Sequence, residues 1–190
     1  MNHLLLLFIS CFLYLGHSSH SCVPTFKIVP ESELEGKNRL DWSAEDRLSW
    51  NDFQAKPDRD SWRIAAITSS VIQYRYYCED GLLNHTVKSI FLKDESWVKD
   101  KARTENYLAH EQLHFDITEV FARNLRKELS KRTFKCNQAK DFEKAIDKVL
   151  KEWKATQIKY DRETEYSLDK SAQKEWIDMI GEILDQTMKW

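Results

Sequence analysis

The sequence contains one motif whose residue types and spacing could perform hydrolytic chemistry, the H-E-x-x-H stretch from His110 to His114. Residues four positions apart lie on the same face of a helix, so both imidazoles can point at one metal ion. Glu111 directly follows the first histidine, and from there its carboxylate can reach a water molecule activated by the metal. The motif therefore indicates zinc-assisted hydrolysis of a peptide or amide, with Glu111 as the general base that later returns the proton to the leaving amine.

A surface helix carrying two solvated histidines and a glutamate is the alternative interpretation of this motif. Two features argue against it. Once a predicted leader is removed, the chain keeps only three histidines, and two of them belong to the motif. In addition, the helix expected over Glu105–Lys131 has an apolar side at helical spacing, which predicts a buried element. That side consists of Leu113, Ile117, Val120 and Leu125, flanked by Leu108 and Phe121.

A catalytic zinc ion needs a third protein ligand, because such sites keep three ligands and one open position. Asp116 and Glu119 lie about 140–200° around the helix from His114, so they are expected to face away from the metal. The segment Tyr160–Ser167 follows a predicted helix, breaks its apolar pattern and is rich in oxygen donors. The residues leave the choice open between four candidates, Asp161, Glu163, Glu165 and Tyr166; the alternative for each is a charged loop between helices.

The N-terminus is predicted to be a signal peptide over residues 1–21, followed by a single domain over residues 22–190. Its apolar run, Leu4–Leu15, spans about 12 residues, which is too short to cross a membrane. The segment before it lacks Lys and Arg, which leaves an uncleaved anchor or a buried N-terminal helix as alternatives. Cys22 allows lipoprotein anchoring as a minority option. We expect a secreted or periplasmic protein without a stable membrane span after leader removal.

Cysteine usage agrees with export. Of the four cysteines, Cys11 would leave with the leader, and Cys22, Cys78 and Cys136 remain. In an oxidising compartment Cys78 and Cys136 form a natural pair, which would tie the end of a strand to the end of the motif helix. The alternative is two unpaired buried thiols. No C-x-x-C sequence is present, so nothing favours a cysteine metal site.

Length and patterning predict one α+β domain. Residues 23–60 form a polar entry segment, in which Trp50 and Phe53 are expected to contact the core. Residues 64–77 and 86–92 are rich in β-branched and aromatic residues, and a turn signal lies between them at Glu79–Gly81. They predict a small antiparallel sheet, whose exposed edge could pair with an extended peptide.

Three helices are expected after the sheet: the motif helix, a second over residues 138–160 and a third over Lys170–Met188. The formal net charge is −2 with no block of like charge, so no nucleic-acid partner is expected. Oligomeric state cannot be predicted from these patterns.

Several stretches of this sequence resemble one known family. They are Leu48–Phe53, Ala65–Ser70, Ser96–Val98, Leu108–Ile117 with its H-E-Q-x-H-F-D motif, Tyr160-Asp161-x-x-Thr164, Gln173 and Trp176. These stretches resemble the bacterial family of predicted secreted zinc-dependent proteases, which is classed as a domain of unknown function. The resemblance implies an exported, zincin-like metallopeptidase with the motif on its first long helix, and it implies no particular substrate.

One position departs from the family pattern. The family's downstream motif is similar to Y-D-x-x-T-x-H, and this chain has Tyr166 where the histidine would stand. Either Asp161 is the third ligand, or Tyr166 replaces the histidine, or the site is degraded. We predict that His110, His114 and Asp161 bind Zn²⁺, and that Tyr166 lies nearby as a ligand or as a donor to the oxyanion of the reaction.

The sequence therefore predicts an exported zinc metallopeptidase that acts on a peptide or protein substrate, with Glu111 and Tyr166 as catalytic residues. The alternative is a non-catalytic exported binding or scaffold domain that retains a degraded metal site.

Overall fold

A computed structural model describes residues 27–57 and 64–190 of the chain. The predicted signal peptide and Cys22 lie outside these residues, so the boundaries of the mature domain stay a prediction. Within the described ranges, none of the helices combines the length and the hydrophobicity that a membrane-spanning segment requires.

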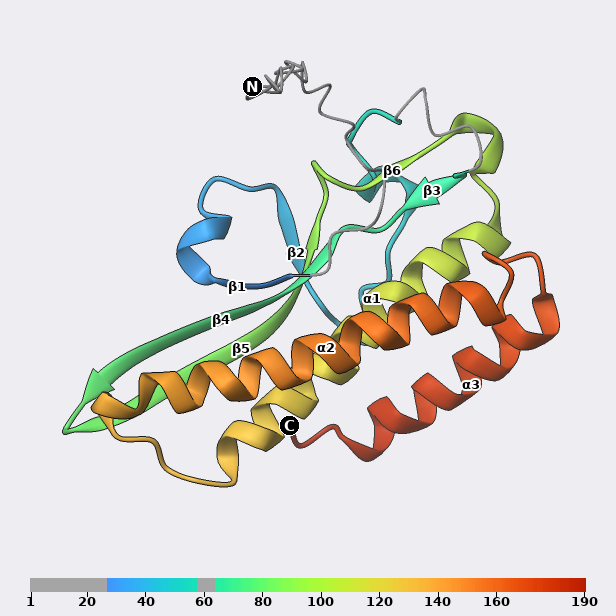
Figure 1. The fold of residues 1–190 in the computed structure, drawn as a ribbon. Helices are drawn as coiled ribbons and strands as arrows, with labels where there is room; N and C mark the ends of the chain where they lie inside the picture. The colour runs from blue at the N-terminus through green and yellow to red at the C-terminus, as the bar shows by residue number, and fades with distance from the viewer. Residues whose placement is uncertain (1–26, 58–63) are drawn as a thin grey trace, which may run out of the picture.

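The main sheet has four strands in the order β1-β4-β5-β2 (Figure 1). A long hairpin of β4 (Ser70–Glu79) and β5 (Leu82–Leu92) forms its centre. The edge strands are β1 (Lys27–Pro30), parallel to β4, and β2 (Arg39–Asp41), antiparallel to β5. A second sheet pairs β3 (Ala66–Ile67) with β6 (Trp97–Val98) in antiparallel fashion.

The expectation of an antiparallel sheet was wrong at one edge, because β1 pairs in parallel with residues 71–74 of β4. Both edge strands come from the entry segment, where no strand was predicted. They are only four and three residues long, too short to show a clear alternation of apolar and polar residues. These strands also cover parts of the edges where peptide pairing was expected, next to residues 71–74 and 90–92.

The tip of the hairpin is closed by a local turn and a covalent link. Asp80 and Gly81 both have positive φ angles, 50° and 77°, as a two-residue type I′ turn requires. Cys78 forms the predicted disulfide with Cys136, across a sequence separation of 58 residues. A loop of that length is stabilised by about 4 kcal/mol in the chain-entropy model. The disulfide fastens the hairpin tip to the segment that follows the motif helix.

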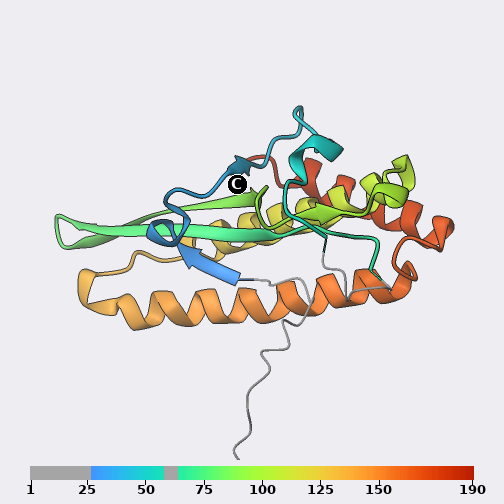
Figure 2. The ribbon, with the colours of Figure 1, turned by 90° about the horizontal axis from the view of Figure 1, so that it is seen from above.

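Three helices follow the sheet, as predicted: α1 (Glu105–Ser130), α2 (Ala139–Glu163) and α3 (Lys170–Gln186). The Thr104 side chain caps α1, and the Asp169 side chain caps α3. Helix α1 packs against β4, β5, α2 and α3 (Figure 1), whereas α2 runs alongside the hairpin (Figure 2). Helix α2 extends to Glu163, three residues beyond its predicted end.

The largest core lies between the sheet and the helices. It joins residues of β4 and β5 to the apolar sides of all three helices, including Ile72, Val87, Ile117, Leu125, Trp153, Trp176 and Ile180. A second core surrounds the small sheet, and there Phe53 is buried against Trp50 and Phe91, as expected for the entry segment. Because α1 contributes to both cores, its middle section is buried on nearly every side.

Candidate metal centre

The structure brings His110, His114 and Asp161 together at the interface of α1 and α2. The Asp161 Oδ1 atom lies 3.2 Å from His110 Nε2 and 3.0 Å from His114 Nε2. The three potential ligand atoms all lie within 4.8 Å of one another, so these residues could hold a metal ion. The two histidines come from successive turns of α1, and Asp161 comes from the last turns of α2.

Tyr160 holds the two imidazoles in place. Tyr160 is fully buried, and its ring stacks on that of His110 at a centroid distance of 4.6 Å. Its ring also makes an edge contact with the His114 ring, at a centroid distance of 4.9 Å. Its hydroxyl donates to the Gln173 side chain, and it also lies 3.2 Å from the His110 carbonyl oxygen. Burial raises the pKa of the Tyr160 phenol, so this hydroxyl keeps its proton and acts as a donor.

The donor set fits a tetrahedral divalent cation. Ligand atoms that each lie about 2.0–2.1 Å from zinc are about 3.3 Å apart in a tetrahedron, close to the two measured separations. Imidazole nitrogen and carboxylate oxygen are both common zinc ligands. The side chains of His110 and His114 are 5% and 7% exposed, whereas that of Asp161 is 20% exposed. Solvent therefore reaches the cluster on its Asp161 side.

Electrostatics favour a positive charge at the centre of this cluster. Burial alone would lower the pKa of His114, but the hydrogen bond and charge of Asp161, with the charge of Glu111, raise it to about 9. Burial acts to raise the pKa of Asp161, but hydrogen bonds from His110 and His114 hold it well below its usual range. A cation between the imidazoles and the carboxylate is thus favoured, whether a proton or a metal ion supplies it.

Glu111 is buried next to the cluster, with 5% of its surface exposed. Its main-chain oxygen accepts a hydrogen bond from the Thr68 hydroxyl at 3.0 Å, which fixes this turn of α1 to the strand region. Within residues 27–57 and 64–190, its carboxylate makes no hydrogen bond or ion pair. A buried carboxylate adjacent to a candidate metal-binding group lies where a general base would be needed.

The other oxygen donors of the Tyr160–Ser167 segment lie outside the cluster of three ligand atoms. Glu163 accepts a hydrogen bond from Trp176 Nε1, and Glu165 is exposed. Tyr166 is 69% exposed, in a turn where residues 165–167 all have positive φ angles. Its predicted role as a ligand or oxyanion donor stays a prediction.

Asp116 and Glu119 face away from the cluster, as predicted. Asp116 accepts hydrogen bonds from Trp42, Arg47 and Gln112, and Glu119 pairs with Arg123 and Arg126.

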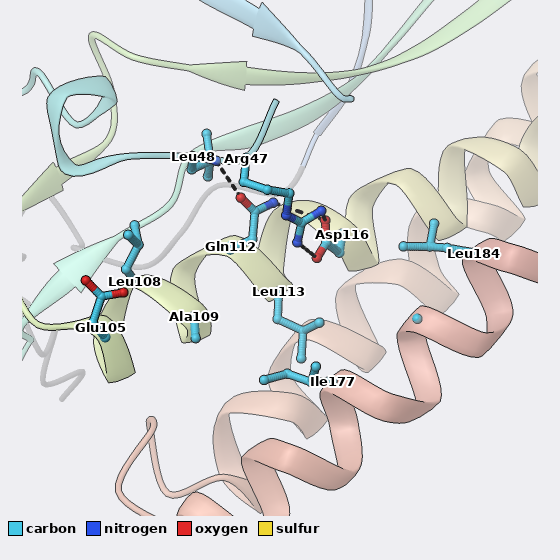
Figure 3. A pocket seen from close by; sticks show the side chains of 11 residues that line it. Arg47, Leu48, Glu105, Leu108, Ala109, Gln112, Leu113, Asp116, Ile177 and Leu184 are labelled. Carbon is cyan, nitrogen blue, oxygen red and sulfur yellow. Dashed lines mark hydrogen bonds and ion pairs between the residues drawn. The ribbon is translucent and has the colours of Figure 1, made fainter. Parts of the chain in front are cut away.

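A cavity of about 390 Å³ lies beside Asp116, lined by Arg47, Leu108, Gln112, Ile177 and Leu184 among others. In Figure 3 the side chains of Arg47 and Gln112 lie beside each other at this cavity, and both donate hydrogen bonds to Asp116. Gln112 is about 200° around α1 from His110, so the cavity lies on the side of α1 opposite the candidate metal centre.

Sequence analysis missed Gln157 and assigned no role to Gln173. The Gln157 side-chain oxygen lies 2.6 Å from His114 Nδ1, and that of Gln173 lies 3.0 Å from His110 Nδ1. A signal for Gln157 existed, since it precedes Asp161 by four residues on the buried side of α2 and interrupts a stripe of apolar residues.

Residues 93–167 match a family model described as "Bacterial protein of unknown function (DUF922)". The matched segment contains both histidines, Glu111 and Asp161, but covers less than half of the chain. Comparisons with curated proteins and with solved structures found no match. The similarity to a bacterial family of unknown function thus agrees with the resemblance seen in the sequence, and the family's description assigns no protease activity.

Proposed function

We propose that this protein is an exported zinc-dependent metallopeptidase. The observation that carries the proposal is the convergence of His110, His114 and Asp161, with the buried carboxylate of Glu111 beside them. Two imidazoles and one carboxylate are a donor set used by catalytic zinc sites, which leave one position open. The exposed fraction of Asp161 provides the access to solvent that such an open position needs.

A zinc ion, when bound, supplies Lewis-acid activation of water and of a substrate carbonyl. Glu111 would accept a proton from the attacking water as the bond between its oxygen and the peptide carbon forms. The same carboxyl group would then donate that proton to the nitrogen as the carbon–nitrogen bond breaks. His110, His114 and Asp161 would hold the metal and keep their orientation throughout.

Export is supported by the disulfide between Cys78 and Cys136, because structural disulfides persist in oxidising compartments. The apolar run near the N-terminus, Leu4–Leu15, supports the same location. The substrate is proposed only as a peptide or protein.

Glu111→Gln separates catalysis from metal binding. We expect this variant to keep near-stoichiometric zinc and to lose about 10²–10⁴-fold in the rate of peptide hydrolysis, because a general base contributes that much. Elemental analysis and the cleavage of a mixed protein substrate would measure the two quantities. Glu105→Gln, at an exposed position of the same helix, is the matched control and should retain both. A wild-type protein that binds zinc but cleaves no peptide would support the non-catalytic alternative.

A further inference from the structure

Two glutamine side chains lie against the Nδ1 atoms of the two candidate histidine ligands. Gln157 of α2 lies against Nδ1 of His114, and Gln173 of α3 lies against Nδ1 of His110. Gln157 is fully buried, and Gln173 is 4% exposed. Each histidine therefore has one nitrogen directed at a glutamine and the other, Nε2, directed at Asp161.

The hydrogen bonds of Gln157 determine the tautomer of His114. The Gln157 Nε2 atom donates to the main-chain oxygen of His114 at 2.9 Å and to Thr118 Oγ1 at 3.3 Å. Because a carbonyl oxygen only accepts, this contact fixes the orientation of the amide and places Oε1 at His114 Nδ1. An amide oxygen also only accepts, so Nδ1 must carry the hydrogen. When neutral, His114 then has its lone pair on Nε2.

Thr118 connects this arrangement to the sheet. Its hydroxyl donates to the His114 main-chain oxygen at 2.9 Å and forms a 2.7 Å hydrogen bond with the hydroxyl of Ser70 in β4. Thr118 is fully buried, and Ser70 is 1% exposed. A satisfied buried network of this kind has a single favourable arrangement, so it holds Gln157 in a fixed position.

Gln173 makes the equivalent contact to His110 with fewer partners. Its Oε1 atom accepts from the Tyr160 hydroxyl at 2.7 Å and faces His110 Nδ1 at 3.0 Å. Its Nε2 atom is buried and has no hydrogen-bond partner within the described part of the chain. Gln173 is thus held less firmly than Gln157.

We propose that Gln157 and Gln173 are positioning residues, which hold His114 and His110 with hydrogen on Nδ1 and thereby direct both Nε2 lone pairs at the metal. This inference rests on the proposed function. In this arrangement two lone pairs and one carboxylate meet without a donor between them, and a cation relieves their repulsion. Because both amides are neutral, Asp161 is the one formal negative charge among these five side chains.

Zinc affinity in Gln157→Leu and Gln173→Leu tests this role. Loss of an outer hydrogen-bond partner typically weakens metal binding by about 10–100-fold, and we expect the larger loss in Gln157→Leu. Gln157→Glu keeps an acceptor at Nδ1 but loses the amide donor to the His114 main-chain oxygen, so it should recover part, and not all, of the affinity lost in the leucine variant. Gln186→Leu, an exposed glutamine of α3, is the control and should bind zinc with wild-type affinity. Competition with a chromogenic chelator measures the zinc affinities of the four variants and of the wild type.

A spectroscopic measurement distinguishes tautomer control from a general structural role. In ¹⁵N–¹H spectra of the zinc-loaded wild type, both histidines should show an Nδ1 proton that exchanges slowly with water. Gln157→Leu should lose this protection at His114 only, and Gln173→Leu at His110 only. Metal bound through Nδ1, or leucine variants with unchanged affinity and unchanged protection, would overturn the inference.

The zinc binding and peptide cleavage of the wild type distinguish a failure of the proposed function from a failure of this inference. If the wild type binds no zinc, the metallopeptidase proposal is wrong and the inference fails with it. If the wild type binds zinc and cleaves peptides while both leucine variants behave like the wild type, only the inference is wrong. Where a leucine variant does not fold, the affinity of Gln157→Glu and the two Nδ1 protons of the wild type decide the question.

Discussion

Helix α1 carries two buried polar faces that differ in how their charges are satisfied. On one face, the Asp116 carboxylate receives hydrogen bonds from Trp42, Arg47 and Gln112, so protein donors satisfy it fully. On the other face, Asp161 of α2 meets two imidazoles whose Nδ1 atoms already face glutamine oxygens. On the first face, protein donors satisfy the carboxylate. On the second face, the group of two imidazoles and Asp161 needs a cation, which a proton or a metal ion can supply.

This difference separates a structural carboxylate from a ligand better than burial does. The Asp116 side chain is 6% exposed and thus more deeply buried than that of Asp161, which is 20% exposed. The cavity of about 390 Å³ also lies beside Asp116 and not beside the candidate metal centre. Burial and the presence of this cavity would therefore point to the Asp116 face, whereas the matching of donors to acceptors favours the face with the H-E-x-x-H motif as the candidate metal centre.

Replacing Asp161 should have the largest effect on metal binding. Asp161→Ala removes one of three protein ligands, so zinc affinity should fall by more than the roughly 100-fold that loss of an outer partner can cause. Asp116→Ala should leave zinc affinity unchanged within about twofold, since Asp116 faces the other way. Chelator competition on both variants compares the two faces directly; an equal loss in both would contradict the distinction.

Replacing Asp116 should have the largest effect on stability. Asp116→Ala leaves the donors of Trp42 and Gln112 without an acceptor, at a cost of about 1–3 kcal/mol for each buried group. We expect the free energy of unfolding to fall by about 2–4 kcal/mol, measured by urea denaturation. Asp41→Ala, which removes an exposed pair with Lys88, is the control and should cost less than about 1 kcal/mol. A loss no larger than that of the control would show that the Asp116 network contributes little.

Replacing Tyr166 should have little effect on metal binding. Tyr166→Phe removes a hydroxyl from a side chain that is 69% exposed, so zinc affinity should stay within about twofold of the wild type. A tenfold or greater loss would instead identify Tyr166 as a ligand. The same variant reports on the oxyanion role, because removing an oxyanion donor lowers kcat by about 10²–10³-fold.

The sequence predicted the helices and the grouping of the candidate ligands better than it predicted the edges of the sheet. The motif helix and the histidines were found because helical periodicity and ligand spacing coincide over Glu105–Ser130. Edge strands β1 and β2 were missed because their three or four residues depend on pairing with β4 and β5, which is a non-local contact.

The end of α2 was misjudged for a reason that concerns the site itself. The segment that begins at Tyr160 breaks the apolar pattern of α2, which suggested that the helix ends there. Helix α2 in fact continues to Glu163, and Asp161 lies 3.0 Å from His114. The interruption thus marks a polar site inside the helix and not its end, a distinction that requires knowledge of what the helix packs against.

The most direct test of the metal centre is X-ray absorption at the zinc edge of the zinc-loaded wild-type protein. The account predicts a first shell of nitrogen and oxygen atoms at about 2.0–2.1 Å, with the outer-shell scattering of two imidazoles and no sulfur. A shell that contains sulfur, that lacks imidazole scattering, or that matches hydrated zinc would contradict the assignment of His110, His114 and Asp161 as the ligands.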